Sequence, residues 1–253
     1  MNSPQPGAVV TGAGSGIGRE TAILFGKRGL HVLCAGRTRA SLEETAALIE
    51  AAGGTSRVIV SDCGSDAGRA VLVEAAAQFS IEAFVHSAGA DRIKPFAETT
   101  RDDFDALVAI NLAAPFFLVQ SLLARLADGA GVVFVGSVSA QRGMARHAAY
   151  GATKAALIGL TVNLATELGP RIRVNCVSPG ATDTTMLADF IMRSREGLSE
   201  KAAQRQHIAA ASRNLLRRVA APAEVAETVV HLALDATAVT GIDVPVDMGY
   251  TAS

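Results

Sequence analysis

Short apolar runs alternate with longer segments of helical periodicity along the whole chain. The short runs are almost wholly apolar, which is typical of strands that are buried on both faces of a parallel sheet. Strands and helices in this order favour an α/β fold, a doubly wound parallel sheet of about seven strands with helices on both faces. The expected strands cover residues 8–11, 31–35, 57–61, 83–87, 132–136, 173–177 and 243–246.

The expected helices fill the intervals between these strands. They cover residues 16–28, 40–52, 66–79, 102–126, 148–168 and 222–234, with a further helical region that follows the sixth strand and runs to about Arg218. No repeat, low-complexity tract or Pro/Ser-rich linker interrupts the pattern, so residues 1–253 are expected to form one domain. The polar, Arg-rich stretch 184–218 is the least patterned and is the expected substrate lid.

The charge balance limits the classes of partner. The 253 residues include 23 Lys and Arg and 24 Asp and Glu, a formal net charge of −1. Such a chain has no electrostatic attraction for nucleic acid or for an acidic membrane surface. Hydrophobic residues make up 49% of the chain, which favours a globular core over disorder.

The cysteines and the N-terminal residues favour a cytoplasmic protein. Three cysteines cannot build a disulfide framework, and Cys34 and Cys176 lie in apolar strand runs, as buried thiols of a reducing compartment would. Residues 1–6 carry neither the basic nor the apolar part of a signal peptide. The apolar stretch 107–126 is long enough to span a bilayer but contains too many polar groups, so it is expected to be a helix buried by protein. No Cys/His cluster has the spacing of metal ligands, so no metal is expected.

A glycine-rich turn joins the first expected strand to the first expected helix. It reads Thr11-Gly12-Ala13-Gly14-Ser15-Gly16-Ile17-Gly18. Glycines let the backbone approach a pyrophosphate, whose charge is then stabilised by free N–H groups at the helix N-terminus. The position of the turn within a strand–helix–strand unit predicts nucleotide binding in a Rossmann-type domain rather than a purely structural turn.

A tyrosine and a lysine stand four residues apart on an expected helix. Tyr150 and Lys154 therefore share one helix face. A free phenol titrates near pH 10, so it is a poor acid–base group at neutral pH, but a neighbouring ammonium lowers its pKa. Ser137, at the end of the fifth expected strand, could hold a substrate oxygen beside the Tyr150 hydroxyl, and Ser139 is a nearby alternative.

The glycine spacing and these polar residues resemble those of the short-chain dehydrogenase/reductase family, in its short, single-domain branch of 3-oxoacyl reductase type. Asn111, Ser137, Tyr150 and Lys154 match the family's Asn–Ser–Tyr–Lys set. The resemblance implies that Tyr150 is the general acid/base and that Ser137 orients and polarises the carbonyl. It also implies that Lys154 lowers the pKa of Tyr150 and holds the nicotinamide ribose, and that Asn111 supports a proton relay.

The residue after the second strand bears on the choice of coenzyme. An acidic residue about 20 positions after the glycines would hold the ribose 2′-hydroxyl of NAD. Here Arg37 stands in that region, and its guanidinium suits the 2′-phosphate of NADP. NADP is therefore the expected coenzyme. NAD remains an alternative, because the glycine turn carries Ser15 where NADP-preferring relatives often have a basic residue.

The resemblance implies further coenzyme contacts at other strand ends. Asp62 matches the position that contacts the adenine amino group, and its alternative role is a cap on the turn. His86-Ser87-Ala88-Gly89 stands where the family usually has Asn-Asn-Ala-Gly, and His86 is expected to be structural rather than catalytic. The full expected coenzyme set is Gly12, Ser15, Gly16, Ile17, Gly18, Arg37, Asp62, Cys63, Ala88, Gly89, Asn111, Tyr150, Lys154, Pro179, Gly180, Thr182 and Thr184.

The C-terminal residues 246–250 match the family's Val-Asp-Gly-Gly segment, with Met248 in place of the first glycine. In relatives this segment lies near subunit contacts, and helices equivalent to 102–126 and 148–168 form the dimer interface. The resemblance therefore implies a homo-oligomer, a dimer or a tetramer, although the same helices could simply be buried in the core.

Together these features predict an NADP-dependent oxidoreductase that transfers hydride between the nicotinamide and a small carbonyl or secondary alcohol substrate. Alternatives are the same reaction with NAD, an inactive nucleotide-binding scaffold, or an isomerase or dehydratase on the same fold. Cationic residues recur in the expected substrate loops, which would suit an anionic substrate, but solvated loops in an Arg-rich protein are the favoured explanation. They are Arg92, Lys94, Arg142, Arg146, His147, Arg193, Arg195, Arg205 and His207.

Overall fold

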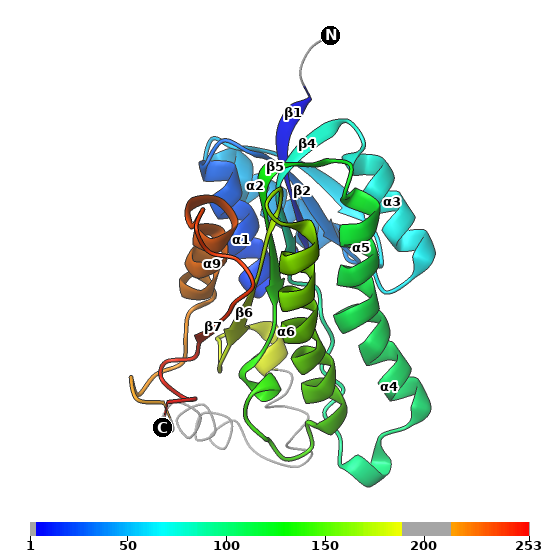
Figure 1. The fold of residues 1–253 in the computed structure, drawn as a ribbon, viewed down its shortest axis with the longest axis vertical. Helices are drawn as coiled ribbons and strands as arrows, with labels where there is room; N and C mark the ends of the chain where they lie inside the picture. Colours follow the sequence, from blue (N-terminus) through cyan, green and yellow to red (C-terminus); the bar gives the residue numbers. More distant parts are fainter. Residues whose placement is uncertain (1–3, 189–213, 253) are drawn as a thin grey trace.

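Seven parallel strands form one sheet in the order β3-β2-β1-β4-β5-β6-β7. The computed structural model describes residues 4–188 and 214–252. The strands are β1 (Gln5–Thr11), β2 (His31–Gly36), β3 (Thr55–Val60), β4 (Phe79–His86), β5 (Leu126–Val135), β6 (Arg173–Pro179) and β7 (Asp243–Val246). The order reverses between β1 and β4, which makes the sheet doubly wound. The predicted fold class is confirmed (Figure 1).

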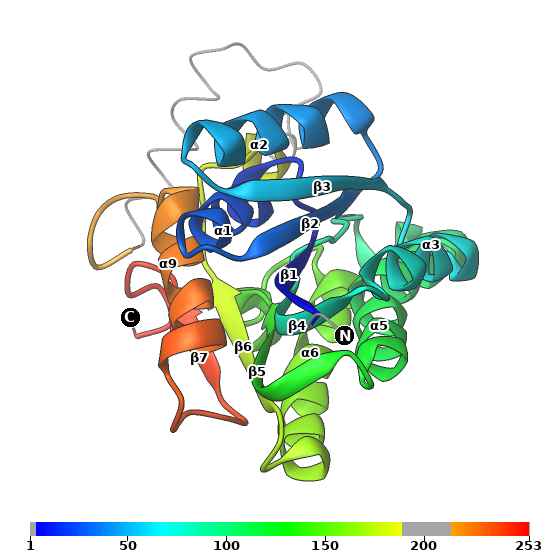
Figure 2. The ribbon, with the colours of Figure 1, turned by 90° about the horizontal axis from the view of Figure 1, so that it is seen from above.

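Helices cover both faces of the sheet (Figure 2). One layer holds α1 (Gly16–Lys27), α2 (Arg39–Ala51) and α9 (Pro222–Val230), and the other holds α3 (Asp66–Ala76), α5 (Ala114–Leu122) and α6 (Ala148–Leu168). The side chains of successive strand residues face the two helical layers in turn: Val9 and Leu33 pack with α3 and α5, and Val10 and Cys34 pack with α1 and α2. This alternation follows from the two-residue period of a strand and explains the continuous apolar runs.

Short helical pieces complete the described chain. The 3₁₀ turns are η1 (Phe96–Glu98) and η3 (Val138–Ala140). Helix α4 (Arg101–Val108) continues through a π turn, η2 (Ala109–Ala113), into α5, and α9 continues into a second π turn, η4 (His231–Asp235). The stretch Arg101–Leu122 is long and apolar enough to cross a membrane by length and composition. In the structure it packs on the sheet, with four leucine and alanine side chains completely buried: Leu107, Ala114, Leu118 and Leu122.

Several predicted boundaries are wrong, mostly at the starts of strands. Helix α3 ends at Ala76, so Phe79 begins β4 rather than ending a helix, and α5 ends at Leu122, so Leu126 begins β5. Strand β1 also begins earlier than residue 8. The predicted helical region does not reach Arg218, because residues 214–218 form turns. Most of the expected lid, residues 189–213, lies outside the described residues.

Candidate active site

The expected site residues come together at the carboxyl edge of the sheet. Strands β1, β4, β5 and β6 end side by side there, and each is followed by a segment with expected site residues. In a doubly wound sheet the ligand crevice lies at this edge, where the strand order reverses.

The glycine turn after β1 is shaped by close backbone contacts. Gly12 has φ +70°, and a Cβ on it would lie 2.7 Å from the Ala88 backbone nitrogen. A Cβ on Gly18 would lie 2.3 Å from the Gly12 carbonyl oxygen. Ser15, the N-cap of α1, forms no side-chain capping bond to the helix. The helix N-terminus thus keeps N–H groups for an anion, and the cradle fits a pyrophosphate.

Tyr150, near the start of α6, lies beside the Ser137 side chain. Ser137 follows β5, and its Oγ also lies 2.9 Å from Ser139 Oγ, which donates to it. Burial raises the pKa of Tyr150 to about 12; the neighbouring Ser137 hydroxyl lowers this pKa, and the negative charge of Asp91 raises it. The surroundings of the ring thus oppose the lowered pKa that the Tyr–Lys spacing predicts.

Lys154 is buried on the same helix face. Its Nζ donates to the Val135 carbonyl oxygen at 2.8 Å and lies 5.9 Å from the centre of the Tyr150 ring. Burial lowers the pKa of Lys154 to about 8. The backbone of β5 therefore positions both Ser137 and the ammonium that faces the tyrosine.

Asn111 is completely buried in the π turn η2. Its Oδ1 accepts the Ala90 N–H at 3.0 Å, and its Nδ2 donates to the Ala90 carbonyl and to Thr153 Oγ1, each at 3.1 Å. The Thr153 hydroxyl donates to the Tyr150 carbonyl oxygen at 2.8 Å. A Cβ on Gly89 would lie 3.2 Å from Asn111 Oδ1 and 3.6 Å from Lys154 Nζ. Asn111 thus joins the segment after β4 to the helix that carries Tyr150 and Lys154.

His86, at the end of β4, has both ring nitrogens engaged. Nδ1 lies 3.0 Å from Thr11 Oγ1 and Nε2 lies 3.0 Å from the Ile110 carbonyl oxygen. The side chain is completely buried among protein groups. This placement agrees with the expected structural role.

The residues after β2 and β3 share one rim of the site. Arg37 and Asp62 are exposed, and both charges act on the buried thiol of Cys63 between them. Burial raises the pKa of Cys63 to about 11. The Gly64 N–H donates to Asp62 Oδ1 at 3.0 Å, so Asp62 does cap its own turn, while its exposed position leaves it open to a ligand.

The segment after β6 lies over the glycine turn. A Cβ on Gly16 would lie 3.0 Å from Thr184 Cγ2. The Thr184 hydroxyl donates to the Thr182 carbonyl at 3.3 Å. Gly180, which follows Pro179, packs so closely on Asp247 that a Cβ would lie 2.8 Å from the Asp247 Cα. Residues far apart in the chain, 16 and 184, are therefore neighbours at the site.

Met248, in the C-terminal turn, has φ +57°, a left-handed backbone conformation that glycine usually occupies. Asp247 stabilises the turn by accepting N–H bonds from Gly249 and Thr251. The Met248 carbonyl accepts from the Leu216 N–H at 3.1 Å. The turn thus holds residue 216, close to the end of the expected lid 184–218.

Some of the cations in the expected substrate loops have partners within the protein. Lys94 and Arg92 both contact Asp103. The Arg142 guanidinium lies 4.8 Å from the centre of the Tyr250 ring. These three side chains are thus held by the protein itself. Four further cations of the set lie outside the described residues: Arg193, Arg195, Arg205 and His207.

Sequence reasoning missed three groups that hold the site together: the Thr11 hydroxyl, the Val135 carbonyl and Thr153. Only Thr153 carried a signal, since it lies three residues after Tyr150 and so on nearly the same helix face. No three His, Cys, Asp or Glu side chains gather as metal ligands would within residues 4–188 and 214–252.

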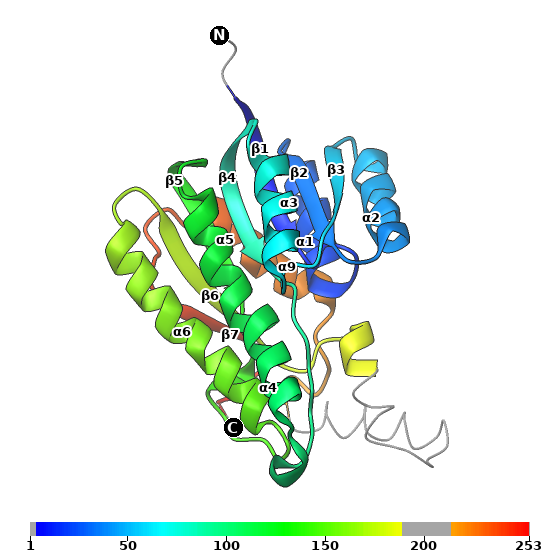
Figure 3. The same cartoon turned by 90° about the vertical axis from the view of Figure 1, so that its right-hand side faces the viewer.

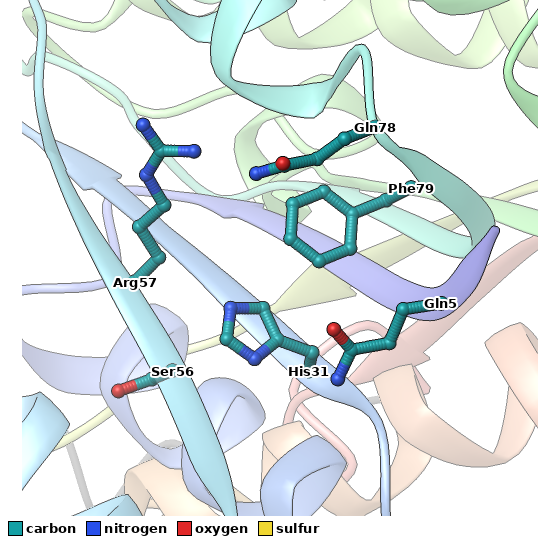
Figure 4. A pocket seen from close by; sticks show the side chains of 6 residues that line it. All are labelled: Gln5, His31, Ser56, Arg57, Gln78 and Phe79. Atoms are coloured by element: carbon teal, nitrogen blue, oxygen red, sulfur yellow. The ribbon is translucent and has the colours of Figure 1, made fainter. Parts of the chain in front are cut away.

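A cavity of about 410 Å³ lies at the other edge of the sheet (Figure 4). Its residues come from the starts of β1, β2, β3 and β4, and the His31 ring stacks on Phe79 with centres 4.9 Å apart. The lining residues are Gln5, His31, Ser56, Arg57, Gln78 and Phe79. This cavity is therefore separate from the candidate site.

Comparison with known proteins agrees with this geometry. A family model described as enoyl-(acyl carrier protein) reductase matches residues 12–251. Short chain dehydrogenase/reductase astE of Aspergillus oryzae is 34% identical, over 96% of this chain and 94% of its own. D-threitol dehydrogenase of Mycolicibacterium smegmatis is 32% identical, over 96% and 92%. The crystal structure of the angucycline C-6 ketoreductase LanV with bound NADP has a TM-score of 0.87, at 29% identity over 100% of both chains.

Proposed function

The chain belongs to the short-chain dehydrogenase/reductase family of oxidoreductases that act on alcohol and carbonyl groups, and on that premise we propose that it transfers hydride between NADP(H) and a carbonyl or secondary alcohol, with Tyr150 as general acid/base. The observation that carries the proposal is that the Tyr150 and Ser137 side chains lie together beside the buried ammonium of Lys154. Two hydroxyls can thus reach one substrate oxygen, next to a positive charge that favours phenolate.

Each of these residues has a distinct role in the proposed reduction. The Ser137 hydroxyl donates a hydrogen bond to the substrate carbonyl oxygen, and the Tyr150 hydroxyl gives its proton to that oxygen. Lys154 stabilises the phenolate that remains. Asn111 orients Ala90 and Thr153 and so supports return of a proton to Tyr150. Bound NADPH would supply the hydride, and in the reverse direction the positive charge of the oxidised nicotinamide would favour the phenolate form of Tyr150.

The coenzyme in this proposal is NADP, held by the glycine turn, Arg37, Asp62, and the segments 88–89 and 179–184. Arg37 is exposed at the rim after β2, where its guanidinium can pair with a 2′-phosphate. LanV, similar over its whole length, has NADP bound in its crystal structure.

The proposal extends to the form of the protein. Residues 1–253 form one cytoplasmic domain, with 184–218 as the substrate lid, and its three cysteines are free and buried. Helices α4, α5 and α6 lie side by side on one outer face (Figure 3). Large apolar side chains on them are 41–48% exposed, which suits a second copy of the chain as partner. They are Phe104, Phe116, Phe117 and Val162.

Tyr150→Phe tests the proposed function. The variant should lose turnover across a panel of carbonyls and alcohols while NADPH still raises its Tm as in the wild type, because a bound ligand stabilises the folded state. Tyr250→Phe is the matched control: it removes the same hydroxyl from the other of the two tyrosines, which lies in the C-terminal turn. Turnover that persists in Tyr150→Phe would contradict the assignment of Tyr150 as the general acid/base. A wild-type protein that binds NADPH but converts no carbonyl or alcohol of the panel would favour the alternative of an inactive nucleotide-binding scaffold.

A further inference from the structure

The helix that carries Asn111 leaves one carbonyl without a helical donor. In the π turn η2 the Ala114 N–H donates to the Ala109 carbonyl. It therefore bypasses the Ile110 carbonyl, which it would bond in an α-helix. The π-type donor to Ile110 would come from residue 115, and Pro115 has no N–H. A buried carbonyl in this position needs a donor from outside the helix.

His86 provides that donor. Its Nε2 lies 3.0 Å from the Ile110 carbonyl oxygen, which can only accept. The ring proton therefore sits on Nε2, and Nδ1 is an acceptor for the Thr11 hydroxyl at 3.0 Å. The same hydroxyl accepts the Ala88 N–H at 3.2 Å. One imidazole tautomer thus satisfies every contact around the ring.

The bond acts on Asn111 through a rigid unit. The Ile110 carbonyl and the Asn111 N–H belong to one planar peptide, so fixing the carbonyl fixes the backbone from which the Asn111 side chain extends. That side chain holds Ala90 by two hydrogen bonds and reaches Thr153, one residue before Lys154. The chain of contacts runs from the glycine turn through His86 to the catalytic helix.

The acceptor role of Nδ1 toward the Thr11 hydroxyl requires an uncharged ring. Burial and the positive charge of Lys154 lower the pKa of His86 to about 3, so the neutral form prevails at physiological pH. Tyr150 and Asp91 are further titratable groups of the site, and the charge of Asp91 acts on Tyr150. A neutral imidazole also adds no second cation beside Lys154.

We propose that His86 is a positioning residue for the proton transfer: its Nε2–H replaces the helical donor that Pro115 lacks and so sets the orientation of Asn111. This inference rests on the proposed function for its kinetic consequence, although the hydrogen-bond arrangement itself does not. The family's usual residue at this position is Asn, whose carboxamide can also donate to a carbonyl, whereas an apolar side chain cannot.

Three variants test the role in turnover. His86→Leu should lower kcat by about tenfold or more, the scale expected when catalytic groups are slightly misplaced, with the Kd for NADPH unchanged. His86→Asn should recover most of the turnover because it restores a donor. The double variant His86→Leu/Pro115→Ala should also recover turnover, since the alanine returns an N–H to the helix. Equal kcat values for His86→Leu and the wild type, or no recovery in the double variant, would overturn the proposal.

A spectroscopic measurement keeps the proposal testable if His86→Leu does not fold or if no substrate is found. In ¹⁵N-labelled wild-type protein, His86 should show a protonated Nε2 and an unprotonated Nδ1 throughout the neutral pH range. Of the five histidines, His231 is exposed and provides the reference signals. A His86 that takes up a second proton in this range, or that carries its proton on Nδ1, would refute the proposed arrangement whether or not the protein is a reductase.

Discussion

Asp103 binds Lys94 through a short ion pair: Lys94 Nζ lies 2.7 Å from Asp103 Oδ2. Arg92 Nη1 contacts the other carboxylate oxygen at 3.1 Å, and the Thr100 hydroxyl and N–H also donate to Asp103. The carboxylate is buried at the first turn of α4, while the two cations come from the loop after β4. The loop cations that an anionic substrate would need are thus used to fix the loop.

Asp103→Asn should lower the Tm by several degrees, because both cations lose their partner. The Lys94, Thr100 and Arg92 contacts hold the pKa of Asp103 well below its usual range. A lowered carboxyl pKa contributes stability that is complete above the unfolded pKa of about 4 and disappears as the pH falls below it. Thermal unfolding followed from neutral to acid pH should therefore show a steeper acid loss in the wild type than in Asp103→Asn.

Asp102→Asn is the control for this measurement, because the Asp102 carboxylate, next to Asp103 in the chain, is exposed and forms none of these contacts. It should follow the wild type at every pH. If Asp103→Asn unfolds at the wild-type temperature at neutral pH, the ion pairs do not stabilise the fold.

Asp91→Asn should shift the pH profile of alcohol oxidation to lower pH. The negative charge of Asp91 contributes to the raised pKa of Tyr150, and oxidation needs the phenolate as base. Removing the charge lowers that pKa, so kcat/KM should reach its plateau at a lower pH. Asp128→Asn, near the start of β5 at the opposite edge of the sheet, should leave the profile in place. A pH profile that stays unchanged in Asp91→Asn would mean that the pKa of Tyr150 does not set the pH at which kcat/KM for oxidation rises.

The sequence predicts helices and carboxyl strand ends better than amino strand ends. Helix α6 and strand β7 have the predicted bounds. Strands β4 and β5 begin earlier than predicted because each starts with a short paired piece before a register shift. Phe79, Ser80 and Ile81 pair with β1, and Leu126 pairs with Ile81, but Glu82 and Asp128 lie in the irregular stretches that separate these pieces from the apolar runs. Apolar patterning detects burial, not ladder hydrogen bonds.

The polar contacts of the site illustrate a second limit. The Tyr150–Lys154 spacing follows from helix geometry and is visible in the sequence. The π turn around Asn111 is not, because it depends on a donor from His86, 24 residues before Ile110, and on the missing N–H of Pro115. Such long-range pairings are set by tertiary packing, which one sequence does not display.

Arg37→Asp should shift the coenzyme preference from NADP towards NAD. The new carboxylate repels a 2′-phosphate and can accept a hydrogen bond from a ribose 2′-hydroxyl. The ratio of kcat/KM values for the two coenzymes measures the shift. Arg39→Asp is the control, since Arg39 lies two residues away and already faces Glu43 at 3.6 Å. An unchanged ratio in Arg37→Asp would show that Arg37 does not read the 2′-phosphate.

Arg173 stabilises the fold from a buried position without a carboxylate partner in the described chain. Its guanidinium donates to the carbonyls of Leu232, Ala233 and Ala236, at the end of η4, over distances of 2.5 to 3.1 Å. A positive charge there also complements the negative end of the helix dipole. Because these carbonyls have no water to replace the guanidinium, Arg173→Met should lower the free energy of unfolding by about 2–4 kcal/mol.

Arg171 provides a matched control for this prediction. It also donates to two backbone carbonyls, those of Leu126 and Leu123, but its side chain is 40% exposed. Water can take over these bonds, so Arg171→Met should cost only about 0.5–1 kcal/mol in urea unfolding. The difference between the two variants reports mainly on burial, because both substitutions remove a guanidinium from backbone carbonyls. Arg171 also lies 3.8 Å from the exposed Asp128, and such a surface ion pair contributes little. Equal losses would show that the buried position of Arg173 adds nothing to its hydrogen bonds.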